Sequence, residues 1–256
     1  DSVGIGELPD APDFGDSGAD TLGNIAAIHP LNLPNLYSLG LNHIERGTKS
    51  HPLSPLSNRK VTPLRGAYGR MIELSRGKDS ATGHWEMMGL VTQTPFKTYP
   101  DGFPSSLVNA LTERCNLQGF LGNCAASGTE IIHRLGEQHL LNGMPILYTS
   151  ADPVLQIAAH EERIDIKTLY SICQHAYDLS LSFGINRVIA RPFTGNPPHF
   201  VRTSNRKDFT MPPTGKTALD GLIERGVHVV GIGKTGQLFA HRGFSDTIKT
   251  ENNDDG

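Results

Sequence analysis

Groups that could do chemistry are concentrated in residues 77–89, Gly-Lys-Asp-Ser-Ala-Thr-Gly-His-Trp-Glu-Met-Met-Gly. The segment predicts a loop that presents a hydroxyl and then begins a helix. Thr82 suits a helix N-cap, and it equally suits a nucleophile at a helix N-terminus, where exposed N–H groups favour a phosphate on the hydroxyl. In a third interpretation Asp79, His84 and Glu86 are metal ligands, although their spacing matches no tight metal motif.

A second polar group follows an expected strand at residues 144–149. Ser150 and Asp152 come next, and Pro153 is well placed at the first position of a helix expected over residues 153–162. Either these residues begin a capped helix, or they bind a ligand at the carboxyl end of a strand. Residues 160–162, His-Glu-Glu, are interpreted as a solvated helix face with the histidine near the core.

A third group is cationic. Arg191 directly follows an expected strand at residues 187–190. Arg202 and Arg206 lie farther along, in residues 195–213, a basic and proline-rich stretch that predicts a loop. The arginines could form a bidentate phosphate clamp or simply a solvated basic loop. Lys234 is a fourth candidate, because it follows an expected buried strand at residues 227–232.

The remaining pattern predicts strands that alternate with helices. We expect a helix from about residue 20, an exposed loop over residues 47–63, a linker over residues 94–104, and further helices over residues 105–114, 128–141, 165–181 and 217–225. Such alternation is typical of an α/β architecture.

Composition limits the class of protein. The chain has 256 residues, of which 37% are hydrophobic and 19% charged, as in a globular protein. A net charge of -3 without a Lys/Arg stripe disfavours a nucleic-acid surface, and the sequence contains no apolar run of the roughly 20 residues that span a membrane. Three cysteines without a metal spacing predict reduced thiols and a cytoplasmic location.

The first residue, Asp1, precedes the small-residue run Ser-Val-Gly-Ile-Gly. A carboxylate followed by such a loop is a common place for a metal or phosphate ligand. The chain starts without Met and ends in a polar stretch, so both ends look cut, and the sequence does not exclude a targeting segment.

Taken together, these residues resemble the phosphopentomutase family of the alkaline phosphatase superfamily. The motifs that carry the resemblance extend along nearly the whole chain and include residues 1–11, 18–25, 77–86, 99–104, 126–130, 148–152, 156–162 and 189–193. The resemblance implies a metal-binding α/β core, with a sheet flanked by helices, and an inserted α/β cap domain. It places the first part of the core at residues 1–93, the cap at residues 94–212 and the second part of the core at residues 213–256.

The resemblance also implies an activity and its residues. Family members interconvert ribose 1-phosphate and ribose 5-phosphate, and the corresponding deoxyribose pair, through a phosphothreonine that maps to Thr82 and a sugar bisphosphate that also serves as activator. Two divalent cations, usually manganese, activate that threonine, and Asp1 and Thr82 map to the metal shell. Substrate contacts map to Ser150, Asp152, Arg191, Arg202, Arg206 and Lys234. No nucleic acid, membrane or protein partner is implied.

The chain departs from the family pattern at both ends. Family members have an apolar strand before the position of Asp1, and they continue past Gly256 into a region that carries the other metal ligands, including an Asp-His pair that this sequence lacks. We therefore expect a fragment of a working enzyme. The alternatives are a related metal-dependent phosphatase or phosphomutase, and a non-catalytic module that binds sugar phosphates.

Overall fold

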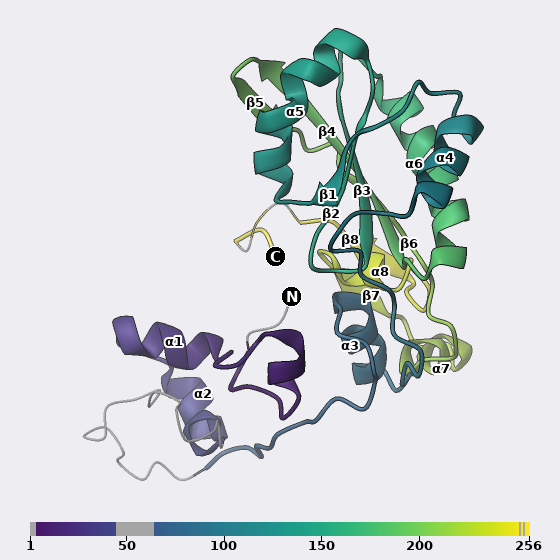
Figure 1. Cartoon of the computed structure of the whole chain (residues 1–256). Helices are drawn as coiled ribbons and strands as arrows, with labels where there is room; N and C mark the ends of the chain where they lie inside the picture. The colour runs from purple at the N-terminus through teal and green to yellow at the C-terminus, as the bar shows by residue number, and fades with distance from the viewer. Residues whose placement is uncertain (1–3, 45–63, 251, 253) are drawn as a thin grey trace. The chain divides into compact units, whose positions relative to one another are not determined.

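The computed structural model describes residues 4–44, 64–250, 252 and 254–256 (Figure 1). Asp1 and the loop expected over residues 47–63 therefore lie outside the described residues. The chain divides into two compact units, Asp1–Glu73 and Leu74–Gly256. Each unit is described by itself.

The first unit consists of short helices: the 3-10 helices η1 (Ala11–Phe14) and η2 (Leu41–His43), and the α-helices α1 (Thr21–Ile28) and α2 (Pro34–Leu39). The helix expected from about residue 20 is confirmed. The buried Asp20 is its N-cap, and its carboxylate accepts hydrogen bonds from the N–H groups of Gly6 and Gly23, both at 3.1 Å.

A six-stranded sheet forms the centre of the second unit. Its strands are β1 (Leu121–Ala125), β2 (Ile146–Thr149), β3 (Val154–His160), β4 (Arg187–Asn196), β5 (His199–Arg202) and β6 (Lys207–Thr210). The order is β1-β2-β3-β4-β5, with β6 also paired to β4. β1 runs parallel to β2 and β3 runs parallel to β4, whereas the other pairings are antiparallel.

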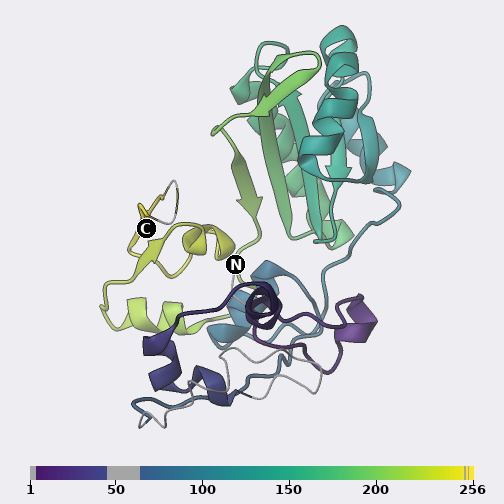
Figure 2. The ribbon, with the colours of Figure 1, turned by 90° about the vertical axis from the view of Figure 1, so that its left-hand side faces the viewer.

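The outer edge of β4 is covered by two short strands instead of one long one. β6 pairs with residues 187–190 of β4, and β5 pairs with residues 193–196. The chain between them, residues 203–206, lies opposite the middle of β4, where the N–H of Thr203 donates to the carbonyl of Pro192 at 3.1 Å. The long β4 and its return into β5 can be followed in green (Figure 2).

Helices cover both faces of this sheet (Figure 1). On one face α4 (Ser105–Arg114) and α6 (Ile166–Ser180) enclose an apolar cluster that includes Leu107 and Leu155. On the other face α5 (Gly128–Asn142) packs on β1, β2, β3 and β5 around a cluster that includes Ile131 and Phe193. The sheet is therefore the middle layer of three.

A third apolar cluster lies outside these layers. The helix α3 (Ser80–Met87) packs with α7 (Ala218–Glu224) and α8 (Thr235–Leu238), beside the parallel strand pair β7 (Val230–Ile232) and β8 (Asp246–Ile248). Trp85 is fully buried at its centre, and its indole N–H donates to the carbonyl of Leu238 at 2.9 Å. Segments on either side of the sheet region in sequence thus share one small core.

Several predicted elements are confirmed, namely α4, α5, α6, α7, β2 and the start of β4. The predicted helix over residues 153–162 is wrong, because that segment is the strand β3. Every residue of β3 is buried, since α5 and α6 cover its two faces. A strand buried on both sides shows no alternation, so its Ala-rich sequence could not be distinguished from a helix by pattern alone.

Two further predictions need correction. Residues 195–213 are not a single loop, because they contain β5 and β6, which pair with β4. The strand expected over residues 227–232 is shorter than predicted and is not buried, since Val230 is 42% and Ile232 is 52% exposed.

The fold is α/β as predicted, with a mixed sheet and helices on both of its faces, although β2 leads directly into β3, and β4 into β5 and β6. Among the residues that the structure describes, no helix is both long enough and apolar enough to cross a bilayer.

Candidate active site

Thr82 lies in the first turn of α3 and is fully buried. The N-cap of this helix is Asp79, so the interpretation of Thr82 as the cap is wrong. One carboxylate oxygen of Asp79 accepts from the N–H groups of Ala81 and Thr82, at 2.9 and 3.1 Å. The other accepts from the Thr82 hydroxyl at 2.6 Å, which fixes that hydroxyl toward the carboxylate.

Asp79 also joins α3 to the central sheet. The side-chain amide of Asn186, which is buried immediately before β4, donates to Asp79 at 3.0 Å. The backbone carbonyl of Asn186 accepts from the N–H of Met211 at 2.8 Å. Thr82, Asp79 and Asn186 therefore form a continuous hydrogen-bonded path that ends beside Arg187, the first residue of β4.

The other polar residues of α3 have local partners. His84 donates from Nδ1 to the carbonyl of Ser80 at 2.6 Å, and Glu86 accepts from the N–H groups of Leu74 and Ser75, both at 2.7 Å. Burial acts to raise the pKa of Glu86, but hydrogen bonds from Ser75 and Leu74 outweigh it and lower that pKa. Among the described residues no three His, Cys, Asp or Glu side chains gather as metal ligands, so the geometry does not support Asp79, His84 and Glu86 as a metal site.

The predicted cationic residues do come together, on the face of the sheet that also carries α5. Arg191 lies on the same face of β4 as Ile189 and Phe193, and its Nε donates to the buried Gln156 of β3 at 3.2 Å. Arg206 is held by Asp208 of β6 in a bidentate pair, with both contacts at 2.6 Å. Sheet pairing places Arg191 opposite Ala158 of β3, and it places Asp208, which holds Arg206, opposite Ile189 of β4.

Arg187 and Asp152 extend the cluster toward the end of β2. Arg187 lies 3.8 Å from Asp208 and 3.9 Å from Asp152, between the two carboxylates. Ser150 and Asp152 are in the turn between β2 and β3, so the interpretation as a capped helix start is wrong. The structure brings Asp152 to the cationic cluster, with Ser150 two residues away in the same turn.

Electrostatic interactions link Lys234 to this cluster. Burial lowers the pKa of Lys234, and the positive charges of Arg206 and Arg187 lower it further. Burial and the nearby Arg206 likewise lower the pKa of Arg191. For Arg206, burial acts to lower the pKa, but Asp208 outweighs it and raises that pKa. An anion would relieve the repulsion among these cations.

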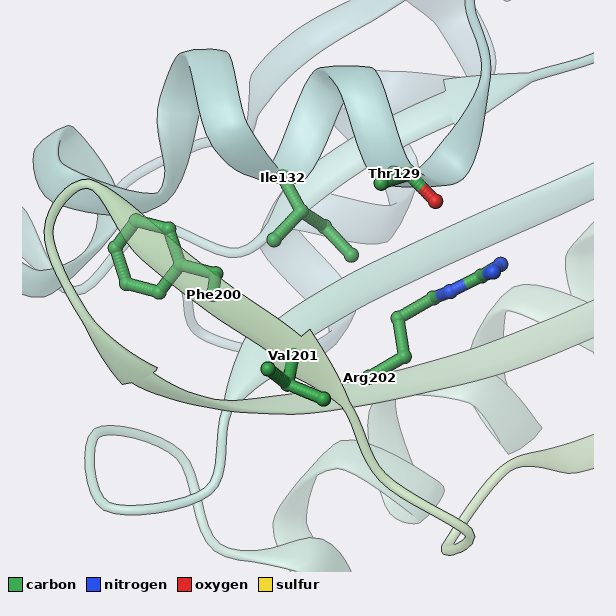
Figure 3. A pocket seen from close by; sticks show the side chains of 5 residues that line it. All are labelled: Thr129, Ile132, Phe200, Val201 and Arg202. Atoms are coloured by element: carbon green, nitrogen blue, oxygen red, sulfur yellow. The ribbon is translucent and has the colours of Figure 1, made fainter.

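Arg202 approaches the same region from β5. It lines a hollow of about 280 Å³ together with Thr129, Ile132, Phe200 and Val201. Figure 3 shows the Arg202 guanidinium and the Thr129 hydroxyl pointing toward the same side of this hollow, with Phe200 at the opposite end. The hollow is therefore polar at one end and apolar at the other.

Comparison with known proteins gives a consistent family. The chain is 48% identical over its whole length to a phosphopentomutase of Caldanaerobacter subterraneus, 50% identical to one of Carboxydothermus hydrogenoformans and 48% identical to one of an Anaeromyxobacter species. It covers 63%, 64% and 64% of these relatives, respectively.

The chain belongs to the phosphopentomutase family. It spans less than two thirds of the length of the phosphopentomutases named above. No protein-family model matches the chain.

Sequence reasoning missed several residues of the cationic cluster and its surroundings. Asp208 is 3% exposed at its side chain and contacts two arginines, but it was interpreted as part of a loop. Glu161, interpreted as a solvated helix residue, accepts from the Thr203 hydroxyl at 2.5 Å and from the Asn205 amide at 3.1 Å. It thereby fixes the short connection between Arg202 and Arg206. The available signal was the spacing of Arg187 and Arg191, which lie four residues apart and therefore on one face of a strand.

Proposed function

We propose that this chain carries the phosphothreonine and the sugar-phosphate contacts of a phosphopentomutase. The observation that carries this proposal is the identity of 46–50% to phosphopentomutases along the entire chain. The reaction interconverts ribose 1-phosphate and ribose 5-phosphate, or the deoxyribose pair, through a sugar bisphosphate. The substrate is accordingly a pentose phosphate.

Thr82 is the proposed phosphoryl carrier. Phosphorylated Thr82 transfers its phosphoryl group to the free hydroxyl of the pentose monophosphate, which gives the sugar bisphosphate and returns the proton of that hydroxyl to Oγ1 of Thr82. After the bisphosphate reorients, Oγ1 attacks the other phosphorus, the bond from that phosphorus to the sugar oxygen breaks, and the proton of Thr82 passes to this oxygen. Because Thr82 is fully buried and donates to Asp79, that hydrogen bond must open before the hydroxyl meets substrate.

The cationic cluster is the proposed substrate site. Arg191, Arg202 and Arg206 hold the phosphate that does not react, while Asp208 keeps Arg206 in place. Lys234 adds positive charge to the same region, and Ser150 and Asp152 can bind sugar hydroxyls. Holding the distant phosphate keeps the bisphosphate from leaving while it reorients.

Two divalent cations, with manganese the expected metal, and activation by a sugar bisphosphate are further parts of the proposal. The described residues gather no metal-ligand cluster, and Asp1 is outside them. Equilibrium dialysis of the chain against Mn²⁺ tests whether it binds a divalent cation. On the proposal that Asp1 is a ligand, Asp1→Asn should weaken this binding.

We further propose that residues 94–212 form a cap inserted into an alkaline-phosphatase-like core, residues 1–93 and 213–256. Two observations support this division. The six-stranded sheet and helices α4, α5 and α6 all fall within residues 94–212. The cluster around Trp85 combines residues that precede this region with Leu219 and Phe239, which follow it.

Labelling tests the role of Thr82. The chain is incubated with a pentose bisphosphate carrying radioactive phosphate, with Mn²⁺ added, and the labelled residue is identified by mass spectrometry. We expect label on Thr82 and none in Thr82→Ala. Label retained in Thr82→Ala would contradict the assignment, and Ser80→Ala, which changes a hydroxyl two residues away, serves as the matched control.

The two alternative functions give different products. A related phosphatase releases inorganic phosphate from ribose 5-phosphate, whereas a mutase yields ribose 1-phosphate. A non-catalytic module binds ribose 5-phosphate in calorimetry with or without Mn²⁺ and converts it to neither product.

A further inference from the structure

The N-terminus of α5 has no side-chain cap. Its N-cap residue, Ser127, makes no capping hydrogen bond, and the helix extends for 15 residues. The first N–H groups of a helix have no partner within the helix, so those of Gly128, Thr129 and Glu130 are available to an external acceptor. The helix dipole adds partial positive charge at the same place.

An unsatisfied hydroxyl lies against this turn. Tyr148, on β2, is fully buried, and its hydroxyl has no hydrogen-bond partner within the described part of the chain. The hydroxyl touches Gly128 so closely that a Cβ at this position would stand 2.7 Å from it. A buried hydroxyl without a hydrogen-bond partner lowers the stability of the folded protein. A bound ligand that accepts from it would remove this cost and explain its presence.

The electrostatic influence of three arginines reaches the same hydroxyl. Burial raises the pKa of Tyr148, while Arg191, Arg202 and Arg206 act to lower it. Arg202 and Thr129, at the polar end of the hollow described above, are directed to one side of it (Figure 3). The main-chain N–H groups of this turn, the Tyr148 phenol and the Arg202 guanidinium are all hydrogen-bond donors, a combination that suits a phosphate.

We propose that the first turn of α5, the Tyr148 hydroxyl and Arg202 form a phosphate-binding site. On the proposed function, on which this assignment depends, the site holds the phosphate of the pentose that is not being transferred. It adds to the arginines a set of main-chain donors and a phenol whose positions are fixed by β2 and α5. Gly128 allows the close approach of the hydroxyl, which a larger residue would block.

Calorimetry with three ligands and a single-atom variant tests the site. Inorganic phosphate and ribose 5-phosphate should bind the wild-type chain, whereas ribose should not. Tyr148→Phe should raise the dissociation constants of both phosphate ligands by about five-fold, the value of one hydrogen bond. The same variant should melt at a higher temperature than wild type without ligand, because it removes an unpaired buried hydroxyl.

Tyr99→Phe is the matched control, because its hydroxyl donates to the carbonyl of Phe183 at 2.6 Å. This control should lower the melting temperature and leave phosphate binding unchanged. Glu130→Gln, which removes a carboxylate from the first turn of α5, should lower the dissociation constant of phosphate by about two-fold.

Several results would overturn the site: no phosphate binding by wild type, equal binding by wild type and Tyr148→Phe, or weaker binding by Glu130→Gln. A different result, the absence of label on Thr82, would contradict the proposed mutase chemistry. Thr82→Ala should bind phosphate at the α5 site as wild type does.

Discussion

At the scale of single residues, Asp79 organises the region around Thr82. Its two carboxylate oxygens accept four hydrogen bonds, from Ala81, from Asn186 and from both the N–H and the hydroxyl of Thr82. Asp165 makes the equivalent three bonds at the start of α6, to Lys167 and to the N–H and hydroxyl of Thr168. The two caps differ in the contact to Asn186.

We expect Asp79→Ala to lower the free energy of unfolding by about 1–2 kcal/mol for the cap, plus about 1 kcal/mol for the bond to Asn186. Asp165→Ala, at an exposed helix start, should lower the free energy of unfolding only by the contribution of the cap. Urea denaturation of both variants measures the difference. Equal losses would show that the Asn186 contact contributes nothing to stability.

His139 gives the molecule a pH dependence. Its Nδ1 donates to the carbonyl of Met144 at 2.8 Å, and its Nε2 accepts from the N–H of His160 at 2.9 Å, so the folded protein holds the neutral ring. Burial lowers the pKa of His139 from 6.5, and the charges on His160 and Arg163 lower it further, against the opposing effect of the Met144 bond. His139 therefore binds a proton in the unfolded chain at a pH at which the folded chain keeps it neutral.

Stability consequently falls as the pH drops below about 6.5. We expect the melting temperature to fall between about pH 7.5 and about pH 5.5, and to fall less in His139→Gln. His199→Gln, at an exposed position of β5, should keep the wild-type slope. An unchanged slope in His139→Gln would contradict this origin of the pH dependence.

At the scale of elements, α5 approaches β5 closely because Gly136 has no side chain. A Cβ at this position would lie 2.5 Å from the ring of Phe200, which is itself buried. Glycine in a helix interior normally costs about 1 kcal/mol relative to alanine, so its presence here reflects packing. The contact fixes the strand that carries Arg202.

We expect Gly136→Ala to destabilise the protein by about 1–3 kcal/mol through overpacking, despite the better helix propensity of alanine. Gly221→Ala, in α7, is the matched control, because its Cβ would make only an ordinary contact 3.6 Å from Arg225. That variant should be neutral or stabilising by up to about 1 kcal/mol. Thermal melts of both variants decide whether packing or propensity dominates in α5.

The helices and strands of the second unit differ in how well the residue pattern predicts them. The amphipathic helices α4, α5 and α6 were predictable because their apolar residues recur at helical spacing. The strand β3 was not, because both of its faces are buried and its alanines are good helix formers. β5 and β6 were also missed, since each is four residues long and is stabilised as a strand only by pairing with β4.

At the scale of the whole molecule, the second unit contains cores of different size. Large clusters line both faces of the central sheet, whereas the cluster around Trp85 is small. The hydrogen bonds of Asn186 to Asp79 and Met211 connect the two regions. Trp85 is the only tryptophan, so its fluorescence reports on the smaller core.

We expect denaturant unfolding to occur in separate steps, because less apolar area is buried around Trp85. Tryptophan fluorescence should change at a lower urea concentration than the far-UV circular dichroism, which is dominated by the sheet and its helices. Coincident curves would instead indicate one cooperative unit. Asn186→Ala, which removes a link between the regions, should separate the two transitions further.

The sequence by itself determined the α/β class, most helices and the family, because these depend on residue periodicity and on motifs that are contiguous in the chain. It also identified Thr82 and the arginines as candidates. Only the tertiary structure decided that Asp79 rather than Thr82 caps α3, that Asp208 pairs with Arg206, and that the Tyr148 hydroxyl meets the start of α5. These contacts join residues on different strands and helices, and their geometry depends on sheet register and packing, which no local pattern encodes.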